Sequence, residues 1–294
     1  MRAFWDEVRA PSLVHEGTQV AVSAIRGTEP VRALPPSTNR IRFERHLGSG
    51  SFGDVFLAHD ELRHLAVKML RRGGLGRDDS VAEARLLAGL PPHPNVVTIH
   101  YLTEVEGRFA LAMEYLDGPT LQQRGERNAL SLREVVRIGQ QLAKGISFLH
   151  DHCLLHRDVK PQNVIETHAG RVVLTDFGLA ANFDPTERAW EIPPAGTMAY
   201  MAPEVAVDSR PPSRASDSYS LVATLFFLVC RHPPAEGESF SDVRRQLSHG
   251  IRPALPEGIP NDWTLFFDRG LARVPAARFQ TGAEVDEALA ALEV

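Results

Sequence analysis

The chain has 294 residues, of which 43% are hydrophobic and 23% charged, so it has enough apolar material for one large or two small folded domains. Its net charge of -5 excludes the strongly basic surface that nucleic-acid binding requires, and we expect no nucleic-acid partner. The two cysteines, Cys153 and Cys230, are far apart and lack metal-ligand spacing, which suits two free thiols in a reducing compartment.

The sequence shows no pattern typical of an export signal or a membrane span. The first ten residues mix charges with Phe4 and Trp5 and contain no long apolar run, so they do not resemble a secretory signal. The longest apolar run, residues 221–230, is too short to cross a bilayer, which takes about 20 residues. We therefore predict a buried helix there and a cytoplasmic chain with no membrane segment.

The first 40 residues differ from the rest of the chain. They contain turn-forming clusters around Pro30 and over residues 35–39, one possible strand over 18–25, and no helical period. We interpret residues 1–40 as an N-terminal extension, flexible or regulatory, that precedes a main domain over residues 41–294.

A glycine-rich segment over residues 48–53 is the first motif that carries chemistry. Its glycines let backbone N–H groups approach phosphates closely, and it lies between strand-like residues 41–46 and 55–58. The same pattern fits a dinucleotide-binding turn, but that turn needs a helix directly afterwards, whereas a second strand follows here. We therefore predict a β-hairpin that covers phosphates, followed by a strand over residues 65–70 that contains Lys68.

The loop over residues 156–163 is the richest in reactive groups. Asp158 can accept the proton of an incoming hydroxyl, Lys160 can neutralise a phosphoryl group, and Asn163 can bind a divalent cation through its carbonyl oxygen. A short apolar strand over 172–175 ends in Asp176, which adds a second hard oxygen ligand. Taken alone the loop would be a basic surface turn, whereas this order of motifs indicates a phosphoryl-transfer site.

The order of a glycine-rich hairpin, an Ala-Val-Lys strand, a His-Arg-Asp loop and Asp-Phe-Gly resembles the protein kinase family. Lys160, two residues after Asp158, resembles the serine/threonine type, and the arginine-rich, lysine-poor composition favours bacterial members with eukaryotic-like domains. The resemblance runs from about residue 41 to the C-terminus. It implies a two-lobed α+β fold, with a small β-rich lobe and one main helix over residues 41–113 and a larger, mostly helical lobe over 117–294.

The resemblance also implies the activity and its residues. We expect an ATP-dependent kinase that phosphorylates protein serine and threonine hydroxyls, itself included, in a signalling role, with Mg²⁺ or alternatively Mn²⁺ as the metal. Asp158 would be the base and Lys160 and Lys68 catalytic cations, with Lys68 held by Glu83 on a helix over 79–90. Asn163 and Asp176 would bind the metal. The nucleotide would contact Gly48, Ser49, Gly50, Ser51, Phe52, Gly53, Val55, Ala66, Lys68, Met113, Glu114, Leu116 and Ile165.

Residues 176–204 resemble an activation segment that ends in Ala-Pro-Glu. Its only serine or threonine residues are Thr197, which matches the family threonine that contacts the catalytic aspartate, and Thr186, a candidate phosphosite. Arg157 could receive a phosphate on Thr186, although a segment that needs no phosphorylation is equally compatible. The resemblance further implies structural roles. Asp217 would anchor the catalytic-loop backbone, and Arg278 would pair with Glu204.

Two other functional classes remain open on the residues alone. One is a pseudokinase, a binding protein of the same fold, although every catalytic position is occupied by the family's residue. The other is a small-molecule kinase, against which the Ala-Pro-Glu segment favours a protein substrate. A metal site among His150, His152, Cys153 and His156 is disfavoured because their spacing fits no closed tetrahedral set. Val222 and Val274 depart from the family pattern at positions expected to lie away from the chemistry.

Overall fold

The computed structural model of the chain describes residue 35 and residues 41–50, 53–70, 87–176, 181–182, 198–237 and 239–294. The predicted strand over 18–25, most of the helix predicted over 79–90 and most of the predicted activation segment lie outside these ranges. Among the candidate site residues, Ser51, Phe52, Glu83, Thr186 and Thr197 also lie outside the described residues.

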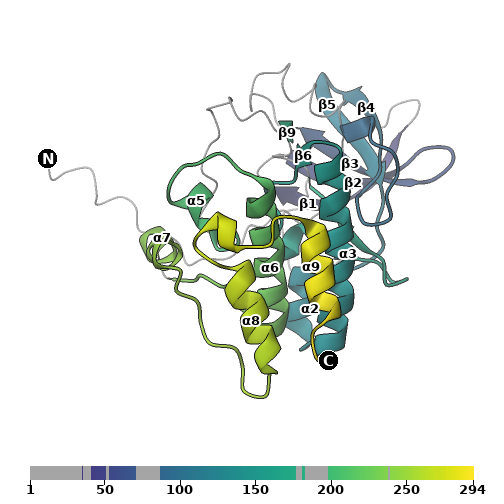
Figure 1. Cartoon of the computed structure of the whole chain (residues 1–294). Helices are drawn as coiled ribbons and strands as arrows, with labels where there is room; N and C mark the ends of the chain where they lie inside the picture. The colour runs from purple at the N-terminus through teal and green to yellow at the C-terminus, as the bar shows by residue number, and fades with distance from the viewer. Residues whose placement is uncertain are drawn as a thin grey trace, which may run out of the picture.

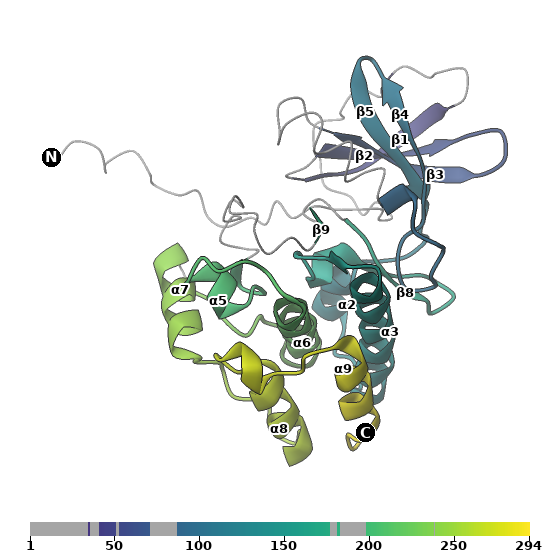
Figure 2. The ribbon, with the colours of Figure 1, turned by 45° about the horizontal axis from the view of Figure 1, so that its top comes forward.

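The small lobe is a five-stranded antiparallel sheet with the strand order β1-β2-β3-β5-β4. Figure 2 shows this sheet as a separate layer beside the helices of the large lobe. Both the glycine-rich hairpin and the strand that carries Lys68 are present, as predicted. The strands are β1 (Arg42–Gly50), β2 (Gly53–His59), β3 (His64–Leu70), β4 (Ile99–Val105) and β5 (Arg108–Glu114).

Alternation along the strands gives the sheet two different faces, because successive side chains point to opposite sides. On β3, Ala66 belongs to a hydrophobic core that continues into the large lobe, whereas Leu65, Val67 and Met69 belong to a second core. The second core is confined to the small lobe and is closed by residues near the start of β1, Ile41 among them. The first face therefore looks toward the large lobe, and it is the face that can line a cleft.

Helices dominate the large lobe, which lies below the sheet in Figure 2 and whose helices are labelled in Figure 1. The longest, α3, is begun by a capping box between Ser131 and Glu134, and it confirms the helix predicted over 130–150. The helices are α2 (Leu121–Arg127), α3 (Leu132–Asp151), α5 (Pro203–Ala206), α6 (Arg214–Cys230), α7 (Phe240–His249), α8 (Asn261–Gly270) and α9 (Gly282–Ala290), with 3-10 turns η1 (Pro161–Asn163) and η2 (Pro275–Ala277).

Helix α6 is the central element of the large lobe. It includes the run over 221–230 that the composition predicted to be a buried helix, and it begins earlier, at Arg214, behind the N-cap Ser213. Its residues are buried from Ala215 through Leu228, so the helix is covered on all sides by the rest of the lobe. No helix among the described residues has the length and hydropathy needed to cross a membrane.

Two short antiparallel ladders flank the loop over residues 156–163. Strand β6 (Leu154–Leu155) pairs with β9 (Ala181–Asn182), and β7 (Val164–Glu166) pairs with β8 (Val172–Leu174). The segment before β4 is attached to β8, because Val97 donates its N–H to Leu174 O at 2.9 Å and Leu174 donates back to Asn95 O at 2.9 Å. Residues 95–97 are therefore bound directly to the large lobe.

Candidate active site

Asp217, in the first turn of α6, holds the backbone at the start of the 156–163 loop. Its Oδ2 accepts the N–H of His156 at 2.9 Å, and its Oδ1 accepts the N–H of Arg157 at 2.9 Å. His150 Nε2 completes the set at 2.9 Å from Oδ2. Burial alone would raise the pKa of Asp217, but the hydrogen bond and charge of His150 and the N–H of Arg157 bring that pKa below its ordinary value.

His156 connects the loop to the strand that precedes Asp176. The imidazole is completely buried; its Nε2 lies 3.0 Å from the carbonyl oxygen of Thr175, and Nδ1 accepts the N–H of Asp158 at 3.3 Å. These partners assign the proton to Nε2. Arg157 and Asp176 both have left-handed backbones, with φ of 65° and 60°, so two predicted site residues adopt a conformation that non-glycine residues rarely take.

Asp158 is a buried carboxylate whose two oxygens differ: one is saturated with hydrogen-bond donors and the other has none among the described residues. Oδ2 accepts from Lys160 Nζ at 2.8 Å and from Asn163 Nδ2 at 2.8 Å. Oδ1 has no hydrogen-bond partner among the described residues. Burial raises the pKa of Asp158 above its ordinary value, and the nearby positive charge of Lys160 offsets this only in part. The carboxylate is thus positioned by Oδ2 while Oδ1 remains available to an incoming donor.

Asn163 presents its carbonyl oxygen in the same way. Its Nδ2 donates to the backbone oxygen of Asp158 at 2.9 Å as well as to the carboxylate, and this fixes the amide orientation. Its Oδ1 is buried without a hydrogen-bond partner in the described part of the chain. A hard oxygen in this state fits a ligand of a divalent cation, so the donor set of Asn163 and Asp176 is compatible with the predicted metal.

Lys68 forms a buried ion pair with the carboxylate of Asp176, and both residues are only 4% exposed. The pair brings together residues 108 positions apart in the sequence. Sequence reasoning assigned Lys68 to Glu83, which lies outside the described residues, and did not anticipate the contact with Asp176. No sequence signal marks this contact, because the two residues lie 108 positions apart and no local pattern connects them.

Several of the predicted nucleotide-binding residues that the structure describes lie on one face of the small-lobe sheet. The register of the sheet sets Gly48 opposite Val55 and Val55 opposite Lys68 in one cross-strand row, and sets Ala66 opposite Met113 in the next. Gly53 has no room for a side chain, since a Cβ there would lie 2.1 Å from Met69 O. The apolar members that share a single core across both lobes are Val55, Ala66, Met113, Leu116 and Ile165.

Glu114 differs from its neighbours in this group. Its backbone N–H is already bound to Thr98 O at 2.9 Å, and its carboxylate forms an ion pair with Arg171, on the side away from the core that contains Met113. The side chain therefore has a role outside the predicted nucleotide surface. Neither this pair nor the hydrogen bond from Thr175 Oγ1 to Asn163 O, at 3.0 Å, was marked by any sequence motif.

Arg278 and Glu204 form a bidentate ion pair in the interior. Nη1 lies 2.9 Å from Oε1 and Nη2 lies 2.7 Å from Oε2, and the residues are 2% and 4% exposed. Arg278 donates its other N–H groups to the carbonyl oxygens of Ala272, Ala215 and Arg273, and its guanidinium lies over the Tyr219 ring. The pair ties the end of the 176–204 segment to the base of the large lobe.

Comparison with known proteins places this geometry in a family. Residues 41–283 match the family model described as protein kinase domain. The serine/threonine-protein kinase PknK of Mycobacterium tuberculosis is 35% identical over 254 residues, which cover 83% of this chain and 23% of that protein. PknF of the same species is 33% identical over 261 residues, with 83% and 54% covered.

The serine/threonine-protein kinase PrkC of Bacillus subtilis is 28% identical over 263 residues, which cover 85% of this chain and 40% of that protein. The chain thus spans between about a quarter and about half of the length of these curated relatives. Because the family model covers most of its sequence, the chain belongs to the protein kinase family, which confirms the predicted family and its two-lobed α+β fold.

Proposed function

We propose that this chain is a serine/threonine protein kinase that transfers the γ-phosphoryl group of ATP to serine and threonine hydroxyls of proteins, itself included. The observation that carries the proposal is the state of Asp158, a buried carboxylate that is positioned by Lys160 and Asn163 and retains one oxygen with no hydrogen-bond partner among the described residues. The names of the bacterial relatives support the same substrate class. Regulation through Thr186 and Arg157, and a separate role for residues 1–40, stay predictions.

In this mechanism the residues act mainly by positioning and by charge. Asp158 Oδ1 accepts the hydrogen bond of the acceptor hydroxyl and takes its proton as the hydroxyl oxygen attacks the γ-phosphorus, while the bond from the γ-phosphorus to the β,γ-bridging oxygen breaks and ADP leaves. The raised pKa of Asp158 strengthens it as a base compared with an ordinary aspartate. Lys160, already 2.8 Å from Oδ2, neutralises the transferring phosphoryl group. Lys68 must exchange its contact with Asp176 for the phosphates of the nucleotide.

The metal contributes one element of this chemistry. Asn163 Oδ1 and the carboxylate of Asp176 would bind Mg²⁺, or Mn²⁺ in its place, and the bound cation would draw negative charge from the phosphates. The chain's own part is to hold these oxygens in position. Asn163 is fixed through its amide by Asp158 and through its backbone by Thr175, and the Thr175 carbonyl is fixed in turn by His156.

The test is phosphate transfer in a defined mixture. The purified chain is incubated with ATP and Mg²⁺, or with Mn²⁺, together with a generic acceptor protein, and mass spectrometry maps phosphate on both proteins. We expect phosphoserine or phosphothreonine with the wild type and a loss of about 10²- to 10⁴-fold in Asp158→Asn, since a general base contributes about that much. Asp151→Asn, an exposed aspartate at the end of α3, is the matched control and should label normally.

The other outcomes select the rival classes. ATP binding with no label on any protein would contradict catalysis and favour a pseudokinase. Transfer to a small molecule in place of the acceptor protein would contradict the protein substrate. Equal labelling by the wild type and Asp158→Asn would remove Asp158 from the role of base.

A further inference from the structure

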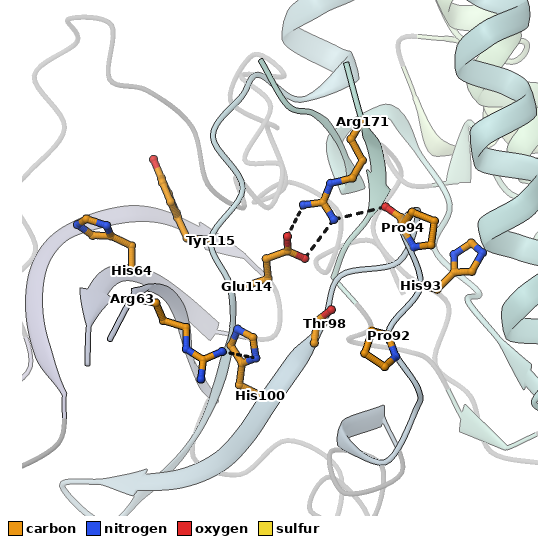
Figure 3. Close-up of a pocket in the computed structure, with 10 residues that line it drawn as sticks. All are labelled: Arg63, His64, Pro92, His93, Pro94, Thr98, His100, Glu114, Tyr115 and Arg171. Carbon is orange, nitrogen blue, oxygen red and sulfur yellow. Dashed lines mark hydrogen bonds and ion pairs between the residues drawn. The ribbon is translucent and has the colours of Figure 1, made fainter. Parts of the chain in front are cut away.

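The chain passes from one lobe to the other over residues 114–116, here called the hinge, which begins at the end of β5. A cavity of about 540 Å³ lies beside the hinge, on the opposite side from the core that contains Met113. Figure 3 shows Glu114 in its centre, with its carboxylate directed at the guanidinium of Arg171. Arg171 Nη2 is bound to Oε1 of Glu114, and Nη1 lies 3.5 Å both from Oε2 of Glu114 and from the carbonyl oxygen of Pro94. One arginine therefore contacts both the end of β5 and the segment before β4.

The backbone that carries Arg171 is fixed to the large lobe. Arg171 closes the turn between β7 and β8, since its N–H donates to Thr167 Oγ1 at 3.2 Å and its carbonyl accepts the N–H of Thr167 at 2.9 Å. Helix α3 holds the same turn from below, because Arg137 and Gln141 donate to Gly170 O at 2.8 and 3.2 Å. The guanidinium thus projects from a rigid part of the large lobe.

The segment that contains Pro94 is fixed to the large lobe as well. Asn95 Nδ2 donates to Val172 O at 2.8 Å and to Gln141 Oε1 at 3.1 Å, in addition to the backbone bonds of residues 95–97 with β8. Glu114, by contrast, belongs to a strand of the small lobe and directly precedes the chain crossing between lobes. The Arg171 contact with Glu114 therefore joins the small-lobe end of the hinge to a frame built on the large lobe.

Other charged groups in the cavity leave this contact undisturbed. Arg63 lies within 3.3 Å of His100 Nδ1 and is also near Asp60. Burial, and after it the charge of Arg63, lowers the pKa of His100, which keeps this imidazole neutral near pH 7 and removes it as a competitor for Glu114. In Figure 3 the Arg63 and His100 side chains point toward each other, apart from the Glu114 and Arg171 pair.

We propose that Arg171 is a positioning residue for the hinge: by holding Glu114 it fixes the hinge backbone against the large lobe and so sets the affinity for the nucleotide. The inference rests on the proposed function, because it assigns ATP to the surface formed by Met113 and Leu116. A hinge that is already fixed loses less conformational freedom when the nucleotide binds. Removing the contact between Arg171 and Glu114 should therefore weaken nucleotide binding. The two side chains remain 34% and 25% exposed, which limits the size of the effect.

The experiment measures the Kd for ATP with Mg²⁺ by titration calorimetry, in the full chain, for Arg171→Gln, Glu114→Gln and the double variant. Each single variant should raise the Kd roughly three- to fivefold, the upper part of the range for a partly exposed ion pair, and the double variant should be no worse than either, because both remove one contact. Arg171→Lys should recover part of the affinity. Arg63→Gln is the matched control, since it lines the same cavity without contacting Glu114, and its Kd should stay within about twofold.

A purely structural role predicts a different pattern. It would lower the melting temperature without changing the Kd of the folded protein, whereas the positioning role changes the Kd and the KM for ATP more than the turnover number at saturating ATP. An unchanged Kd in both single variants, or fully additive effects in the double variant, would overturn the inference. The proposed function would stand in that case, provided that the wild type binds ATP. A wild type that binds no ATP would overturn both.

Discussion

Two buried charged sites of the large lobe differ in whether their polar atoms are hydrogen-bonded. Arg278 and Glu204 satisfy each other in bidentate fashion, and the remaining donors of Arg278 are taken by backbone carbonyls. Asp158 is equally buried, yet its Oδ1 has no partner among the described residues, and the same is true of the amide oxygen of Asn163. Buried polar atoms are normally paired, so an unpaired one requires an explanation.

The difference separates charges that hold the structure from charges that are kept for a ligand. A saturated buried pair contributes little relative to a well-packed apolar pair, but it is costly to break on one side. An unsaturated oxygen weakens the apo protein and gains its partner only when a substrate or cation arrives. The comparison therefore predicts different signs for the stability changes at the two places.

The largest change is expected for Arg278→Met. It leaves Glu204 as a buried charge without a partner, which should lower the free energy of unfolding by about 3–5 kcal/mol. Urea denaturation measures this as a lower midpoint with an unchanged slope. Arg245→Met, which breaks an exposed pair with Asp242, is the control and should cost less than about 0.5 kcal/mol. The comparison would break if a double variant that also replaces Glu204 by Leu regained none of the loss.

Asp217→Asn tests a second saturated carboxylate. The amide cannot accept all three hydrogen bonds that Asp217 receives, so unfolding free energy should fall by about 1.5–3 kcal/mol at pH 7. Because folding lowers the pKa of Asp217 below 3.8, its stabilisation is present above that pH and is lost as the pH falls. The gap between wild type and variant should therefore narrow in acid. Denaturation curves that coincide at pH 7 would contradict the anchoring role.

Asp158→Asn should have the opposite sign and a smaller size. Folding raises the pKa of Asp158 above its ordinary 3.8, so the wild type has its full relative stability below pH 3.8 and loses it as the pH rises through the folded pKa. At pH 7 the variant buries no charge at this position, so its free energy of unfolding should be about 1 kcal/mol higher than that of the wild type, while its kinase activity is lost. Thermal or urea denaturation at pH 7 and in acid measures this, and a variant less stable than the wild type at pH 7 would count against the comparison.

Local patterns account for the elements that the sequence predicted well. The apolar period of α3 and the Ser131 and Glu134 box that begins it are near neighbours in the chain, so their effect is readable from the residues alone. The pairing of Arg278 with Glu204 joins residues 74 positions apart and was expected only through the resemblance to kinases. Chemistry-bearing residues within the 156–163 loop were recognisable because they are adjacent.

Contacts outside both sources of information were missed. The contacts of Lys68 with Asp176 and of Arg171 with Glu114 depend on how the two lobes are set against each other. The contact of Thr175 with Asn163 depends on the register of β7 against β8. An arginine in a short turn and a glutamate at a strand end have many alternative partners of the same charge type. Only the register of the strands and the docking of residues 95–97 on β8 select among them.

The distribution of lysines has a practical consequence for chemical labelling. The chain has three lysines, and two of them, Lys68 and Lys160, are buried in the candidate active site, whereas Lys144 is exposed on α3. Amine-directed reagents modify accessible, unprotonated amines, so apart from the N-terminus Lys144 offers the main competing reaction. A ligand that protects or exposes Lys68 and Lys160 would therefore change a large share of the total lysine labelling, and labelling would report directly on the active site.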